Sequence, residues 1–147
     1  MQIIYSNQDF CLFPFCRSEL LLILKDLLGF FELSSAPEVK LTDDKEIAQF
    51  NAKFLDLPGP TNVLSFPPAA SDSTSLGFIV ISLQALFRES FLYFQNPGEH
   101  MIRLLSHGML HLAEYEHGPL MDDLTEKAID RIVVLFPEQF KDMDIFY

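Results

Sequence analysis

An α+β (α/β-like) fold is predicted for this chain: a single sheet of about four strands covered by helices, with a central buried helix that carries two histidines. Two patterns predict this class. Short runs of β-branched and apolar residues alternate with longer segments of helical spacing, and one late segment is apolar on nearly every side. The 147 residues suffice for one core and no linker or repeat divides them, so a single domain over residues 1–147 is expected.

The first half of the chain alternates strands and helices. Residues 2–5 favour a strand, and leucines at helical spacing then predict a helix over residues 18–31. Residues 39–41 favour a second strand. The next segment begins with carboxylates, which the positive end of a helix dipole favours, so a helix is expected from about Thr42. It must end at the Pro-Gly-Pro sequence of residues 58–60, because proline removes a backbone donor.

The second half adds the central helix. Residues 63–66 and 76–81 favour strands, and the second is apolar enough to be covered on both faces. A helix is expected over residues 83–94. The segment over about residues 98–113 has apolar side chains nearly all round, which is typical of a helix central to a fold. A last helix is expected over about residues 122–136.

Three of the four histidines lie within eleven residues, at His107, His111 and His117. His107 and His111 are four apart, so on a helix their rings lie on one face, and His117 would return from beyond the helix end. Three neutral imidazoles can hold one zinc ion with an open fourth position, where bound water becomes a nucleophile near neutral pH. The spacing therefore predicts a zinc site suited to hydrolysis. The fourth histidine, His100, is expected to face solvent and is given no role.

A protease is the weaker alternative for such a site. Zinc proteases of the metzincin type have the same histidine spacing, with a glutamate directly after the first histidine as general base. Gly108 holds that position here. Among the nearby carboxylates, Glu116 is the better candidate for a catalytic base, ahead of Glu114.

Two segments resemble the motifs of a known family. Residues 107–117 read HGMLHLAEYEH and residues 61–67 read TNVLSFP. In order and spacing they are similar to the H-G-x-L-H-L-x-G-Y-D-H and T-[DN]-V-L-S-F-P segments of the YbeY family, metal-dependent endoribonucleases of bacterial ribosomal RNA maturation. The second segment contains Asn62 and Ser65, which are candidates to line the cleft.

The resemblance implies a function as well as a fold. It implies that His107, His111 and His117 bind one zinc ion, and that the protein cleaves single-stranded RNA near the 3′ end of small-subunit ribosomal RNA. It also implies partnership with ribosomal RNA and the small ribosomal subunit, and a role in ribosome quality control.

Four positions depart from the family pattern, and one of them, Phe78, replaces an aspartate on a strand and is interpreted as structural. Leu55 aligns with a family arginine. Leucine can neither donate hydrogen bonds to a phosphate nor stabilise the charge that develops on it. The alternative is therefore a non-catalytic or weakly active metal-binding factor associated with the ribosome. Glu114 replaces a glycine at a turn where a positive φ is expected, and Glu116 replaces an aspartate but keeps a carboxylate. Any replacement phosphate contact would come from dispersed cations: Arg88, Arg103, Arg131, Lys53 and Lys127.

Charge and cysteine content limit the partners and the compartment. A net charge of −11 disfavours generic binding of nucleic acid, so attraction to RNA would come from a metal, a local basic patch or a partner protein. Cys11 and Cys16 form neither a C-x-x-C pair nor a disulfide framework, which favours a reducing compartment. No signal peptide or membrane span is predicted, so a cytoplasmic location without a membrane partner is expected.

Overall fold

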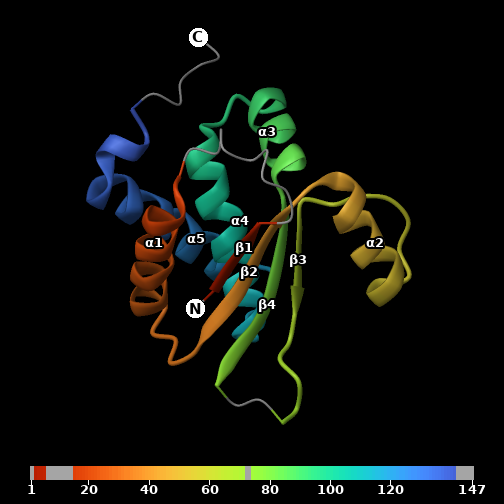
Figure 1. Ribbon diagram of the computed structural model, residues 1–147. Coiled ribbons are helices and arrows are strands. Elements are labelled where there is room, and N and C mark those ends of the chain that lie inside the picture. The colour runs from red at the N-terminus through yellow and green to blue at the C-terminus, as the bar shows by residue number, and fades with distance from the viewer. Residues whose placement is uncertain (1, 6–14, 72–73, 142–147) are drawn as a thin grey trace.

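The computed structural model describes residues 2–5, 15–71 and 74–141, and within them it has the predicted class of fold (Figure 1). Cys11 lies outside the described residues. In chain order the elements are β1 (Gln2–Tyr5), α1 (Arg17–Phe30), β2 (Ala36–Thr42), α2 (Asp44–Leu55), β3 (Val63–Phe66), β4 (Ser75–Ser82), α3 (Leu83–Leu92), α4 (Pro97–Leu112), α5 (Pro119–Leu135) and a 3-10 turn, η2 (Pro137–Gln139). None of the helices in these ranges has the length and apolarity needed to cross a bilayer.

The four strands form one mixed sheet in the order β1-β2-β4-β3. β1 and β2 are parallel, as are β2 and β4, which requires connections that cross over the sheet; α1 and α2 lie within them. β3 instead pairs antiparallel with β4, with Val63 opposite Ile81 and Ser65 opposite Ile79. β3 lies at one edge of the sheet and β1 at the other.

The sheet is covered on both faces. On one face, Ile79 and Ile81 of β4 belong to the main core together with residues of α1, α3, α4 and α5. On the other face, Val80 packs with Leu64 of β3 and Ile47 of α2 in a smaller core. Figure 1 shows α2 across the sheet from α1, α4 and α5. The prediction that the strand over residues 76–81 is covered on both faces is confirmed.

α4 is the central helix that the sequence predicts. Its start is fixed by Asn96, whose side chain accepts hydrogen bonds from the backbone N–H groups of Gly98 and Glu99. Toward its end, Gly108 lets the helix approach the sheet, because a Cβ there would lie 3.0 Å from Ile79 Cδ1 and 3.2 Å from Ser65 Oγ. Close contact with β3 and β4 therefore fixes the C-terminal half of α4.

His100 does not face solvent, contrary to the prediction. It is 7% exposed, because Glu89 on α3 lies against this turn of α4 and pairs with His100 Nε2 at 3.0 Å. Burial lowers the pKa of His100 below its ordinary value, although the hydrogen bond to Glu89 acts in the opposite direction. The pair is thus a hydrogen bond donated by a neutral imidazole to a carboxylate.

The stability of the metal-free protein is expected to fall as the pH is lowered from 7.5 to 5.5. The pKa of His100 is lowered in the fold, so below about pH 6.5 the unfolded chain binds protons that the folded chain does not. His107 and His111, whose pKa values are also lowered, act in the same direction. Urea unfolding with a chelator present measures the effect. His100→Gln can keep the hydrogen bond without titrating and should show a smaller fall; an equal fall in both proteins would contradict the role of His100.

Candidate functional site

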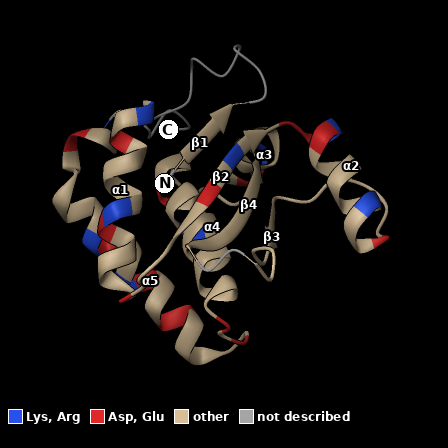
Figure 2. Cartoon of the chain, turned by 60° about the horizontal axis from the view of Figure 1, so that its bottom comes forward, with Lys and Arg blue, Asp and Glu red and all other residues tan. Residues whose placement is uncertain are grey.

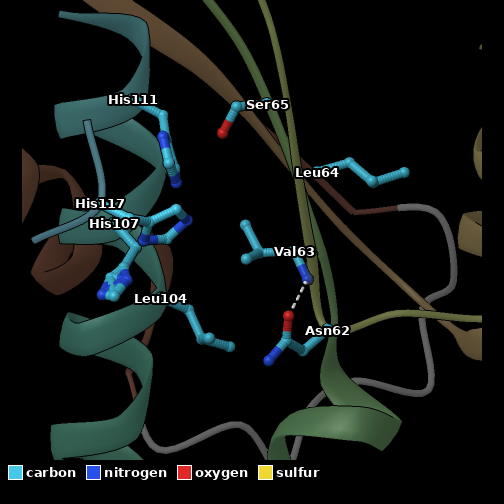
Figure 3. Close-up of a pocket in the computed structure, with 8 residues that line it drawn as sticks. All are labelled: Asn62, Val63, Leu64, Ser65, Leu104, His107, His111 and His117. Carbon is cyan, nitrogen blue, oxygen red and sulfur yellow. Dashed lines mark hydrogen bonds between the residues drawn. The ribbon is translucent and has the colours of Figure 1, made fainter. Parts of the chain in front are cut away.

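The three clustered histidines of the sequence come together in space. The ring centroids of His107 and His111 lie 6.4 Å apart, those of His107 and His117 lie 5.9 Å apart, and those of His111 and His117 lie 4.3 Å apart. Two rings come from one face of α4 and the third from the turn that follows (Figure 3). The predicted grouping is confirmed.

A reversal of the chain after α4 brings His117 back to the helix. Glu114 donates its backbone N–H to the carbonyl of His111, and Tyr115 donates to Leu110, both at 3.0 Å. These two bonds define a Schellman motif, in which the residue at the position of Glu114 is usually glycine. Glu114 has a φ of 69°, so the expectation of a positive φ is confirmed. A non-glycine residue in this left-handed conformation costs about 1–2 kcal/mol.

The histidines form one wall of a cavity of about 500 Å³. Its lining consists of Asn62, Val63, Leu64, Ser65, Leu104, His107, His111 and His117. In Figure 3, Val63 and Ser65 of β3 point across the cavity toward α4, while the side chain of Leu64 points to the other side of the strand. The site thus lies between α4 and β3.

Asn62 and Ser65, predicted to line the cleft, do so and are also held by hydrogen bonds. Asn62 Oδ1 accepts from the backbone N–H of Val63 at 2.7 Å, and Asn62 Nδ2 donates to Glu89 at 3.1 Å. Ser65 Oγ donates to the carbonyl oxygen of Gly108 at 3.4 Å. These contacts tie β3 to α3 and α4, so the cavity walls are positioned by the main fold.

The electrostatics of the cavity favour neutral imidazoles. Burial lowers the pKa of His107, and repulsion from His111 and His117 lowers it further. His111 is exposed overall, and the partial burial of its ring is the first cause of its lowered pKa, with His117 contributing. Neutral imidazole is the form that binds a metal ion.

The separations of the three rings lie near those that a shared zinc ion would require. Imidazoles bound tetrahedrally through nitrogens at 2.0–2.1 Å would have ring centres about 5 Å apart. The observed separations, from 4.3 to 6.4 Å, lie on both sides of that value. As the side chains stand, no three His, Cys, Asp or Glu residues in the described ranges are set to hold an ion. His111 and His117 are exposed, so their rings are free of tight packing and can turn.

A second cavity, of about 430 Å³, adjoins the first and shares Ser65 and His111 with it. Its other lining residues are Ser35, Pro67, Pro68, Ser75, Leu76, Leu112 and Glu114. They come from the end of β3, from the starts of β2 and β4, and from the end of α4. The sequence analysis did not predict this cavity.

The two predicted carboxylates and Leu55 differ in whether they line a cavity. Glu116 is exposed in the turn and lines neither cavity, whereas Glu114 lines the second. Leu55 ends α2, is 48% exposed and lines neither cavity.

The candidate cations do not gather at the histidines. Four of them are in ion pairs with carboxylates: Arg88 with Asp44, Arg131 with Asp26, Lys127 with Asp123, and Arg103 with Glu126. Lys53 is exposed beside the ring of Phe54. Arg103, one helical turn before His107, donates to Gln95 at 2.8 Å. None of the described residues that line the two cavities is Lys or Arg, and Figure 2 shows β3 free of charged residues.

Comparisons with known proteins agree with the resemblance seen in the sequence. The family described as Endoribonuclease YbeY matches residues 18–132. A protein named Endoribonuclease YbeY from Oleidesulfovibrio alaskensis is 46% identical, over 78% of this chain and 81% of the relative. One of the same name from Lawsonia intracellularis is 42% identical, over 82% of this chain and 88% of the relative.

A solved structure supports the fold. The solution structure of TM1509 from Thermotoga maritima has a TM-score of 0.65 to this chain. The match covers 94% of this chain and 93% of that one, at 22% sequence identity. The overall fold is therefore shared with an experimentally determined structure.

Proposed function

The chain belongs to the endoribonuclease YbeY family, and from this membership we propose that it is a zinc-dependent endoribonuclease that hydrolyses single-stranded RNA. The observation that carries the proposal is the convergence of His107, His111 and His117 on one wall of an open cavity. By family resemblance, the substrate is the 3′ region of small-subunit ribosomal RNA, and the setting is maturation and quality control of the small ribosomal subunit.

His107, His111 and His117 would hold the zinc ion. When bound, zinc supplies a Lewis acid and lowers the pKa of bound water to about 7. The low pKa of His107 keeps its imidazole unprotonated near neutral pH, and the packing of α4 fixes its direction. Glu116 lies next to His117, and its carboxylate is proposed to accept a proton during hydrolysis.

The substrate would lie between α4 and β3. Val63 and Leu104 provide apolar surface there, and Asn62 and Ser65 provide polar groups at the strand. An RNA strand entering this cavity meets no lining cation among the described residues, so its phosphates would depend on the metal for attraction.

One observation favours the alternative of a non-catalytic, metal-binding ribosome-associated factor. Leu55 stands where the family has arginine, and it lies on the exposed end of α2. Metal analysis of the purified protein, paired with cleavage of single-stranded RNA and of the matching duplex, separates the two functions. Zinc with cleavage of the single strand is expected. Zinc without cleavage would support the alternative, and hydrolysis of a peptide would point to a protease.

Leu55→Arg is expected to raise the rate of RNA cleavage by tenfold or more. A guanidinium can bind a phosphate through two hydrogen bonds, and loss of one comparable donor slows catalysis by about 10²–10³. The exposed position should tolerate the change within about 0.5 kcal/mol of stability. Leu57→Arg is the matched control, since it adds the same charge to the same exposed segment. Equal rates in the wild type and both variants would mean that another residue already fills the role of the arginine.

A further inference from the structure

The second cavity continues the histidine site along the same cleft. Ser65 and His111 line both cavities, so a strand of RNA held at the histidines would be able to extend into the second. The volume of about 430 Å³ lies within the range of roughly 300–1,000 Å³ that small-molecule sites have. One nucleotide next to the cleaved bond would therefore have space there.

The lining suits a base better than a phosphate. Pro67, Pro68, Leu76 and Leu112 provide apolar walls, and the only charged residue among the described lining residues is Glu114. A carboxylate repels a phosphate, and no lining cation offsets that repulsion. Apolar walls, in contrast, can pack against the apolar face of an unstacked nucleobase.

The backbone of Glu114 is held in a fixed position relative to His111. The hydrogen bond to His111, three residues away, holds it in the left-handed conformation. Strained backbone of this kind is frequent at ligand sites. Among the described residues, no hydrogen bond or ion pair engages the Glu114 carboxylate, and Glu114 is one of the residues that line the cavity.

We propose that the second cavity is a nucleobase subsite and that Glu114 makes it selective for guanine; this rests on the proposed function. A carboxylate has two acceptor oxygens and no donor. Guanine presents two adjacent donors on its Watson–Crick edge, N1–H and the 2-amino group, which match the two oxygens. Adenine, cytosine and uracil each place an acceptor beside their donor, so one oxygen would face a lone pair. Because the family has glycine at this position, the preference belongs to this chain.

Cleavage of single-stranded RNAs that differ at one nucleotide beside the cleaved bond tests the proposal. The wild type is expected to cut the guanine substrate about ten- to hundredfold faster than the adenine substrate, as charged hydrogen bonds imply. Inosine, which lacks the 2-amino group, should be intermediate. Glu114→Gln should reduce the preference to about threefold or less, because its amide N–H₂ faces a guanine donor.

Glu32→Gln is the matched control. Glu32 also has a positive φ, 56°, after a helix, is exposed and lines neither cavity. This variant should keep the guanine preference of the wild type. Equal cutting of all four bases by the wild type, or a guanine preference that survives Glu114→Gln, overturns the proposal.

A binding measurement separates the subsite from the cleavage reaction. In a titration of ¹⁵N-labelled full-length protein followed by NMR, guanosine monophosphate should shift the amide signals of Leu76, Leu112 and Glu114 more than adenosine monophosphate does. Glu114→Gln should remove the difference. If no RNA is cut but this difference appears, the proposed activity fails and the subsite stands. If RNA is cut and the two nucleotides act alike, the subsite fails and the activity stands.

Discussion

His107→Ala is expected to abolish zinc binding and to lower RNA cleavage by about a thousandfold or more. Mutation of a group that only supports a metal ligand lowers metal affinity or activity by about 10–100-fold. His107→Ala removes a ligand itself, so a larger loss is expected. The fold should survive, because His107 is only partly buried and alanine is the best helix former. Zinc content, cleavage of single-stranded RNA and thermal unfolding, measured on the same preparation, give the three readouts.

His100→Gln is the control for that experiment. His100 lies on the same helix but bonds to Glu89 rather than facing the cavity. The variant should retain zinc and cleavage. Equal cleavage by the wild type and by His107→Ala would indicate a contaminating nuclease, and unchanged zinc content in His107→Ala would contradict the assignment of the ligands.

Gly77→Ala is expected to destabilise the protein by about 3 kcal/mol or more. The φ of Gly77 is 135°, which side chains rarely adopt, and a Cβ there would overlap the backbone carbonyl oxygen of Phe66 and touch Leu112. Backbone cannot move aside as a flexible side chain can, so β3 would have to shift against β4. Urea unfolding followed by circular dichroism measures the loss.

Gly29→Ala is the matched substitution for Gly77→Ala. No atom lies within 4 Å of a Cβ built at Gly29, which is on α1. Alanine there should stabilise the protein by up to about 1 kcal/mol, since glycine is unfavourable within helices. If the two substitutions change the stability equally, Gly77 is not required by the close approach of β3 and β4.

Local patterns predicted most of the elements. The alternation of apolar runs located all four strands, and the apolar character of residues 98–113 identified α4 as the central helix. The start of the last helix was wrong by three residues: α5 begins at Pro119, where a proline in the first turn was an available signal. The helix expected over residues 83–94 ends at Leu92, and Phe94 beyond it has a positive φ.

Contacts between distant segments were not predictable in the same way. The histidines were found because α4 and the following turn place them by local geometry. The burial of His100 depends on Glu89, which comes from a different helix. The second cavity joins Ser35, Pro67 and Ser75, which meet only because the strand order puts β4 between β2 and β3.

The division of the core into two parts has a consequence for local unfolding. α2 is anchored through the smaller core, with Ile47, Leu64 and Val80 as its buried residues, whereas α4 is anchored through the larger one. Elements with fewer buried contacts open at lower free energy, so α2 is expected to open more readily than the helix that carries His107 and His111. Leu55 lies at the end of α2. Amino-acid changes there can therefore accumulate without disturbing the histidines.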